Sequence, residues 1–119
     1  MDDFPEFMRN RANLIKTGDQ HTPGIEGYVF DGANGDQIAI WTHVGPGGKE
    51  PGNHTHDFDE WLVVVQGEYV LEMDGRVIQM KPGDEALITR GTPHRGQCGA
   101  GVTRTIHAFG GHRADRQPV

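Results

Sequence analysis

The stretch Tyr-Val-Leu-Glu-Met-Asp-Gly-Arg-Val-Ile-Gln-Met, residues 69–80, reads as two short strands joined by a two-residue turn. Both flanking runs are rich in residues that favour strands. The central pair Asp74-Gly75 suits a type I′ turn, because that turn needs positive φ at both central positions. The stretch therefore predicts a β-hairpin over residues 68–80.

Similar short runs continue on both sides of this hairpin, separated by turn-forming residues. The predicted strands are 27–30, 37–44, 60–66, 68–73, 76–80, 85–89 and 102–109. Between two of them, Pro82-Gly83 supplies the fixed φ and then the positive φ of a type II turn. The segment 45–52 has too many Gly and Pro residues to form an element. This spacing is typical of an all-β barrel or sandwich.

The composition agrees with one small β domain. The chain has 119 residues, including 18 Gly and 7 Pro, and 34% of its residues are hydrophobic. This length excludes a TIM barrel or a two-domain enzyme, and the many turn formers argue against a helical bundle. We expect an N-terminal arm with a short helical turn over 1–24, a barrel over 25–112 and a polar tail over 113–119. The chain is expected to be frayed from Gly110 onward.

Charge and targeting signals restrict the partners. The formal net charge of −6 disfavours nucleic acids and anionic membranes as partners. The first residues lack the features of a signal peptide, and no apolar run approaches the roughly 18 residues of a membrane span. Cys98 is the single cysteine, so the chain has no internal disulfide and no Cys-x-x-Cys zinc site. We therefore expect a cytoplasmic protein whose partner is a small molecule.

Two of the seven histidines form the segment His54-Thr55-His56, and Glu60 follows it. On a strand, residues i and i+2 lie on one face about 6–7 Å apart. Both imidazoles can therefore reach one metal ion at bond lengths of about 2.0–2.1 Å. Glu60 has the same parity, but a straight strand would carry it about 13 Å beyond His56. The chain must therefore turn within residues 57–59 if Glu60 is to join the two histidines.

Other known His-x-His patterns do not fit this segment. The binuclear hydrolase motif His-x-His-x-Asp-His needs Asp at 58 and His at 59, where this chain has Phe58 and Asp59. Amidohydrolases carry their His-x-His motif in TIM barrels of about 250 residues, which this chain is too short to form. The His-Glu-x-x-His motif of zincins is absent.

The segment does resemble the two-part motif of the cupin superfamily of small β-barrels. The first half of that motif matches Gly48, His54, His56, Glu60 and Gly67. The second half matches Gly83, Gly91 and His94, with Thr89 in place of the family's Pro and Cys98 in place of its Asn. The resemblance implies an all-β fold: a double-stranded β-helix, or jelly-roll barrel, with a short irregular N-terminal arm.

The resemblance also implies a metal centre whose ligands are His54, His56, Glu60 and His94. Three imidazoles and one carboxylate suit Fe, Mn, Ni, Cu or Zn as the divalent ion. An octahedral arrangement would leave two neighbouring positions open for water, dioxygen or a chelating substrate. The expected cofactor is therefore one divalent transition-metal ion in the mouth of the barrel.

Five further residues are candidates for contact with a substrate: Trp41, His43, Arg95, Cys98 and His107. Alternation alone does not decide which face of the strands carrying His43 and His107 is inward, so structural or surface roles stay open for both. Cys98 is either a small buried hydrophobic residue or a thiol close to the metal.

Several other charged side chains each have two possible roles. Arg90, Arg95 and Arg104 either bind an anionic substrate group or lie solvated on the surface. Asp57 and Asp59 are expected to be solvated turn residues, and the alternative is that they orient a ligand imidazole. The predicted core contains residues 63–65 and 87–88, and Leu62 and Val64 should line the barrel interior because they share the parity of Glu60.

The resemblance implies a metal-dependent enzyme that acts on a small organic molecule inside the barrel. A dioxygenase-like reaction on Fe(II) is the first expectation, followed by isomerase, lyase or cyclase chemistry with the metal as Lewis acid. The alternative is a non-catalytic domain that binds or senses a small ligand, because a fold does not determine a function. Similar cupins often pair, which implies a homodimer with residues 1–24 at the interface.

Overall fold

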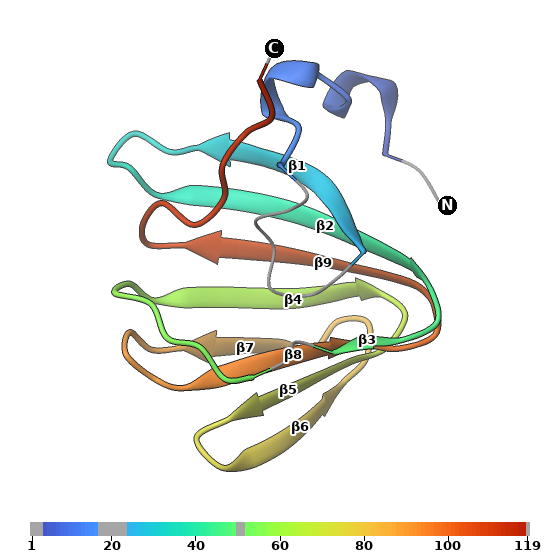
Figure 1. Ribbon diagram of the computed structural model, residues 1–119, viewed down its shortest axis with the longest axis vertical. Helices are drawn as coiled ribbons and strands as arrows, with labels where there is room; N and C mark the ends of the chain where they lie inside the picture. Colours follow the sequence, from blue (N-terminus) through green and yellow to red (C-terminus); the bar gives the residue numbers. More distant parts are fainter. Residues whose placement is uncertain (1–3, 17–23, 50–51, 119) are drawn as a thin grey trace.

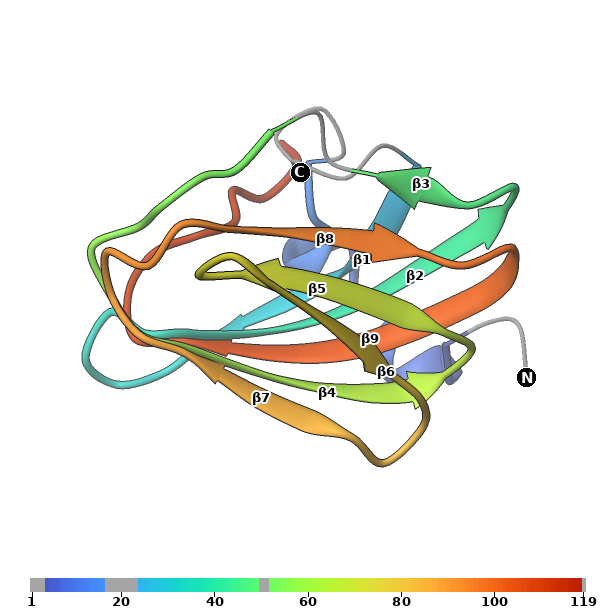
Figure 2. The ribbon, with the colours of Figure 1, turned by 90° about the horizontal axis from the view of Figure 1, so that it is seen from below.

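The computed structural model describes residues 4–16, 24–49 and 52–118, which build two antiparallel sheets (Figure 1). The larger sheet has the order β1-β2-β9-β4-β7, formed by Ile25–Asp31, Gln37–Gly45, Gly101–Phe109, Glu60–Gln66 and Glu85–Ile88. The smaller sheet has the order β3-β8-β5-β6, formed by Gly48–Lys49, His94–Cys98, Tyr69–Met73 and Arg76–Met80. Figure 2 shows the two sheets as facing walls. The predicted all-β jelly-roll barrel is confirmed.

The core lies between the sheets, because alternate residues of each strand point inward. On β4, Glu60, Leu62 and Val64 are at most 5% exposed, as their shared parity predicted. The prediction of a continuous apolar core was wrong for Val65 and Leu87, which are 46% and 56% exposed. Neighbours along a strand face opposite sides, so a run of apolar residues is not buried throughout.

The turn predictions are confirmed. Asp74 and Gly75 have φ values of 52° and 74° between β5 and β6. Gly83 has a φ of 95°, and the Asp84 N–H donates to the Lys81 carbonyl oxygen at 2.9 Å. Both turns follow from local residue preferences alone.

Two strands were missed, and both depend on distant partners. Strand β8 has the polar sequence His-Arg-Gly-Gln-Cys, yet it pairs along its whole length with β5 and at its end with β3. Strand β3 lies inside the segment 45–52 that was predicted to form no element. In both cases the sheet partner, rather than intrinsic propensity, makes the segment a strand.

The segment after β9 packs on the barrel, and the predicted fraying from Gly110 onward was wrong for the described residues. The Gln37 side chain accepts hydrogen bonds from the N–H groups of Arg113 and Ala114 at 2.8 and 2.9 Å and donates to the Ala114 carbonyl at 3.1 Å. Ala114 is fully buried, and Arg116 forms a bridge with Ile15. A polar composition therefore does not imply fraying where a buried side chain satisfies the backbone.

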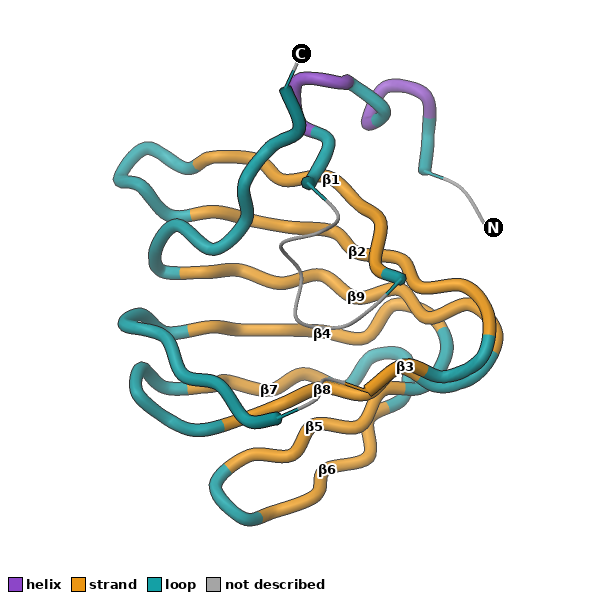
Figure 3. Tube along the Cα trace, in the orientation of Figure 1, coloured by secondary structure: helices purple, strands orange, loops and turns teal. Residues whose placement is uncertain are grey.

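The described part of the predicted arm contains two short 3-10 helices, η1 over Glu6–Met8 and η2 over Arg11–Asn13 (Figure 3). After them, Leu14 pairs with Tyr28 of β1, and the Phe4 ring packs edge-on against the Tyr28 ring at 5.2 Å. Residues 1–3 and 17–23 of the arm lie outside the described residues. Neither helix has the length or apolar character needed to cross a bilayer.

We expect Gly96→Ala to lower the free energy of unfolding by about 1–3 kcal/mol, because overfilling a packed core is destabilising. Gly96 lies inward on β8, and a Cβ there would overlap the buried Tyr69 ring. Gly52→Ala is the matched control, since a Cβ at 52 meets no described atom within 4 Å. The free energy of unfolding is measured for both variants by urea unfolding in the presence of a metal chelator. Equal values for the two variants would contradict the prediction.

Candidate metal centre

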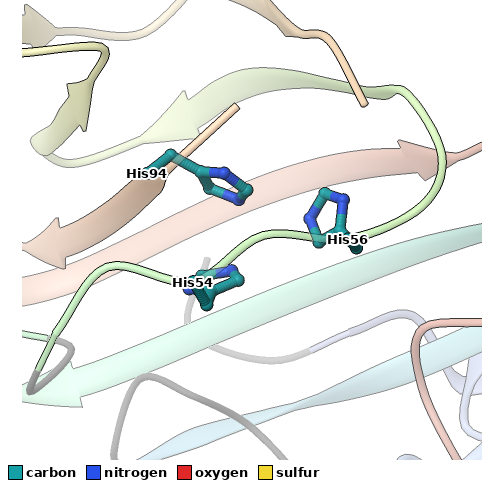
Figure 4. A group of neighbouring side chains, drawn as sticks. All are labelled: His54, His56 and His94. Carbon is teal, nitrogen blue, oxygen red and sulfur yellow. The ribbon is translucent and has the colours of Figure 1, made fainter. Parts of the chain in front are cut away.

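Three imidazoles meet at one end of the barrel because a backbone bridge joins two distant segments. The His54 N–H donates to the His94 carbonyl at 2.9 Å, and the His94 N–H donates to the His54 carbonyl at 3.0 Å. The His54 and His94 ring centroids lie 4.2 Å apart, and His56 lies 4.7 Å from His94. Each residue offers one ring nitrogen, and these nitrogens lie within 4.8 Å of one another (Figure 4).

Backbone carbonyls orient two of these rings. His94 Nδ1 lies 2.8 Å from the Thr92 oxygen, and His56 Nδ1 lies 3.2 Å from the Phe58 oxygen. Because a carbonyl oxygen only accepts hydrogen bonds, this geometry assigns a proton to each Nδ1 and directs each Nε2 into the group. His94 Nε2 is buried and has no hydrogen-bond partner among the described residues. A lone pair directed inward in this way suits a metal ligand.

Glu60 lies next to His56 because the chain bends after His56, as the sequence predicted for residues 57–59. The Glu60 Oε1 atom lies 3.0 Å from His56 Nε2 and 3.7 Å from His94 Nε2. Donors bound at right angles to one ion at about 2.1 Å are themselves about 3 Å apart. The spacing of Glu60 from His56 is therefore that of two donors on one ion, and its spacing from His94 is somewhat longer, while the group of nitrogens within 4.8 Å of one another consists of the three histidines.

Asp57 and Asp59 hold this bend rather than the imidazoles. Asp57 forms an exposed ion pair with the Arg90 guanidinium at 2.8 Å, and Asp59 accepts the Arg90 backbone N–H at 2.8 Å. These contacts join the bend to the loop before β8. The Phe58 ring between them stacks on the His56 ring, with centroids 4.5 Å apart and planes 5° apart.

Buried charges set the protonation of the site. Burial by itself raises the pKa of Glu60, but hydrogen bonds from His107 and His56 outweigh it and hold the pKa well below its usual range. Burial lowers the pKa of His56, yet its bonds to Glu60 and to the Phe58 carbonyl raise the pKa overall. Burial dominates at His94 and lowers its pKa, which favours the neutral imidazole that binds metals.

His107 lies behind Glu60. It points inward on β9, is 1% exposed, and holds Glu60 Oε2 at 2.8 Å through Nδ1. Its Nε2 atom contacts the Thr105 hydroxyl at 2.8 Å, and its ring packs against Trp41 at a centroid distance of 4.2 Å. Although His107 was predicted to contact substrate, its ring nitrogens are engaged by Glu60 and Thr105, so the structure places it as a support for the carboxylate.

The structure separates the other predicted substrate contacts. Trp41 and His43 point inward on β2 and are 7% and 5% exposed, and Cys98 is buried on the inner side of β8. Arg95 points outward on the same strand and forms an ion pair with Glu72, so it does not reach the histidines. The alternation of β8 puts His94 inside and therefore Arg95 outside.

Sequence reasoning missed one cation near the site and misjudged another. Arg104 lies on the outer side of β9, where it donates to the Thr42 hydroxyl at 2.9 Å and covers the Phe4 ring, so it has a structural role. Arg113 was not considered, yet its guanidinium carbon lies 5.8 Å from the Trp41 ring centroid. Nothing in the local sequence marks Arg113, because the Gln37 contact that positions it comes from the start of β2.

Surface shape alone does not locate this site. A hollow of about 670 Å³ lies by β5, β6 and the turn after β6, lined by residues such as Tyr69, Met80 and Lys81. None of its lining residues belongs to the histidine group. The chemistry of the donors therefore carries the assignment.

Comparison with known proteins points the same way. A family model described as the cupin domain matches residues 40–101. The chain is similar to an RmlC-like cupin from Shewanella frigidimarina, with a TM-score of 0.70, 18% identity, and coverage of 95% of this chain and 96% of that one. It is also similar to KdgF from a Halomonas species, with a TM-score of 0.62, 20% identity, and coverage of 87% and 94% respectively.

A third similar structure is a sugar phosphate isomerase of the cupin superfamily from Silicibacter pomeroyi. The TM-score is 0.62 at 22% identity, and the match covers 72% of this chain and 59% of that one. No curated protein matches the chain. At these identities, the structural likenesses establish the fold alone.

We expect Glu60→Gln to destabilise the metal-free protein at pH 7 and to do so less as the pH falls. Because the folded-state pKa of Glu60 is depressed, its charge stabilises the fold above the ordinary carboxyl pKa of 4.5. That contribution is lost as the pH falls from 4.5 toward the lower folded-state pKa. Urea unfolding between pH 7 and pH 3 in a chelator measures the gap between variant and wild type.

The matched control for this prediction is Glu85→Gln, on the exposed side of β7. We expect this variant to leave the free energy of unfolding within about 0.5 kcal/mol of the wild type, as is usual at exposed positions. A gap for Glu60→Gln that stays constant over the whole pH range would contradict the prediction.

Proposed function

This chain belongs to the cupin family, and from this premise we propose that it binds one divalent transition-metal ion through His54, His56, His94 and Glu60. The observation that carries the proposal is the convergence of three ring nitrogens within 4.8 Å of one another. The inward lone pair of His94 and the adjacent Glu60 carboxylate support it.

The donor set fits such an ion. Three imidazoles and one carboxylate suit Fe(II), Mn(II), Ni(II), Cu(II) or Zn(II). Burial of Glu60 and His94, at 5% and 3% exposure, shields the site from bulk water. The Thr92 and Phe58 carbonyls and His107 hold two imidazoles and the carboxylate in place, which limits the reorganisation needed on binding.

We further propose that the protein is an enzyme acting on a small organic molecule at this site. When bound, the metal would supply dioxygen activation as Fe(II) or Lewis-acid activation of a carbonyl in isomerase, lyase or cyclase chemistry. The Phe58 and Phe109 rings flank His56 and make the surroundings of this imidazole apolar. The homodimer implied by the resemblance stays a prediction.

We expect the wild type to bind one ion per chain and His94→Ala to weaken that affinity by more than about 100-fold, since even residues that only support a ligand are worth about 10–100-fold. Thr55→Ala is the matched control, because Thr55 is exposed between the two histidines. Calorimetric titration of metal-free protein with Zn(II), Mn(II) and anaerobic Fe(II) measures the affinities. The wild type failing to bind any of these ions, or equal losses in both variants, would contradict the proposal.

Turnover separates an enzyme from a binding domain. The protein loaded with each ion is incubated with candidate carbonyl substrates, and oxygen uptake and product formation are followed. Turnover that is lost in His94→Ala and kept in Thr55→Ala supports the enzyme. Ligand retention without turnover across all the ions supports the non-catalytic alternative.

A further inference from the structure

The C-terminal segment brings a cation to the mouth of the barrel, and we propose that Arg113, beside Trp41, binds a carboxylate group on the small molecule held at the metal. This inference rests on the proposed function and names the substrate class of that site: an organic anion with one metal-chelating end.

The position of Arg113 is built into the fold. Its backbone N–H donates to Gln37 Oε1 at 2.8 Å, and Gln37 is 2% exposed. The next residue, Ala114, is fully buried and makes two hydrogen bonds with the same Gln37 side chain. A buried amide with three backbone partners holds the chain in one conformation at this point. The Arg113 side chain therefore starts from a fixed backbone rather than a frayed end.

The sheet register sets the reach of this side chain. Gln37 and Glu60 both pair with Phe109, one from each side, so the three residues form one row across β2, β9 and β4. Neighbouring strands are about 4.8 Å apart, which puts Gln37 about 10 Å from Glu60. The backbone of Arg113, which is held by Gln37, is therefore close enough to Glu60 for an extended arginine side chain to cover much of the distance.

The Arg113 guanidinium lies next to the Trp41 ring. Its central carbon is 5.8 Å from the Trp41 ring centroid, within the roughly 6 Å range of a cation–π contact. The Trp41 ring packs against His107, which holds Glu60. Arg113 therefore belongs to the same local environment as the metal ligands.

The charge of this environment favours an anion. A divalent ion with three neutral imidazoles and one carboxylate carries a net positive charge, and Arg113 adds another, although the whole chain has a net charge of −6. A guanidinium can bind a carboxylate through two parallel hydrogen bonds, which gives both strength and orientation. The other arginines considered for an anionic group contact different residues: Arg90 contacts Asp57, Arg95 contacts Glu72 and Arg104 contacts Thr42.

Trp41 adds a second polar contact. Its indole Nε1 is buried and has no hydrogen-bond partner within the described part of the chain. Trp41 points inward on β2 and is 7% exposed. A buried donor without an acceptor is costly unless a ligand or water satisfies it. An anionic ligand beside Arg113 would offer that acceptor.

The test uses two probes with the same chelating oxygens, 3,4-dihydroxybenzoate and catechol, of which only the first has a carboxylate. Both are titrated into Zn(II)-loaded protein by calorimetry, after the Zn(II) affinity itself has been measured. We expect the wild type to prefer 3,4-dihydroxybenzoate by about tenfold or more, the size of one charge-assisted hydrogen-bond pair. Arg113→Gln should abolish this preference and leave the affinity for Zn(II) unchanged.

Three further variants control the result. Arg113→Lys keeps the charge without the paired donors and should restore part of the preference. Gln37→Ala removes the anchor and should reduce the preference with Arg113 still present. Arg95→Gln removes a cation that faces outward and should change nothing. Thermal unfolding of each variant shows whether it is folded.

The outcomes separate this inference from the proposed function. Failure of the wild type to bind Zn(II) overturns the proposed function, and this inference with it. If the wild type does bind Zn(II) stoichiometrically, the proposed metal site stands. This inference alone is then overturned if the wild type binds the two probes equally, or if Arg113→Gln keeps the preference. A preference that Arg113→Gln abolishes at unchanged Zn(II) affinity supports it.

Discussion

Two backbone hydrogen bonds between His54 and His94 are the contact on which the candidate metal centre depends. They join the loop before β4 to the first residue of β8, and they bring the two imidazoles to a centroid distance of 4.2 Å. The pairing of β8 with β5 extends this bridge into the smaller sheet. The approach of His54 to His94 is therefore a consequence of how the barrel closes.

The buried Glu60 carboxylate is the second constraint. A charge removed from water is costly unless hydrogen bonds and opposite charges compensate it. His56 and His107 each contact one carboxylate oxygen, at 3.0 and 2.8 Å, and these contacts compensate the burial of Glu60. Trp41 and Phe109 pack against His107 and fix its ring, so the orientation of Glu60 is set by the aromatic core of the larger sheet. The rigid interior of the barrel is in this way linked to the donor atoms at its mouth.

The C-terminal segment shows how one buried polar side chain can organise a region without regular structure. Gln37 satisfies three backbone groups of Arg113 and Ala114, and the pairing of Ile15 with Arg116 ties the N-terminal arm to the same segment. The described part of the arm and the segment after β9 therefore pack together on the barrel. Arg113 gains a fixed position from this arrangement.

The amino-acid sequence by itself determined what depends on near neighbours. The turn at Asp74-Gly75, the inward parity of Leu62 and Val64, and the proximity of His54 to His56 all follow from local backbone geometry. The resemblance of the motif added His94, which lies beside His54, and Glu60, which lies beside His56. Only the tertiary structure decided that polar β8 is a strand, that Arg95 faces outward, that His107 contacts Glu60 and that Arg113 lies beside Trp41. Each of these depends on a partner far away in the chain, and short-range patterns carry no information about such partners.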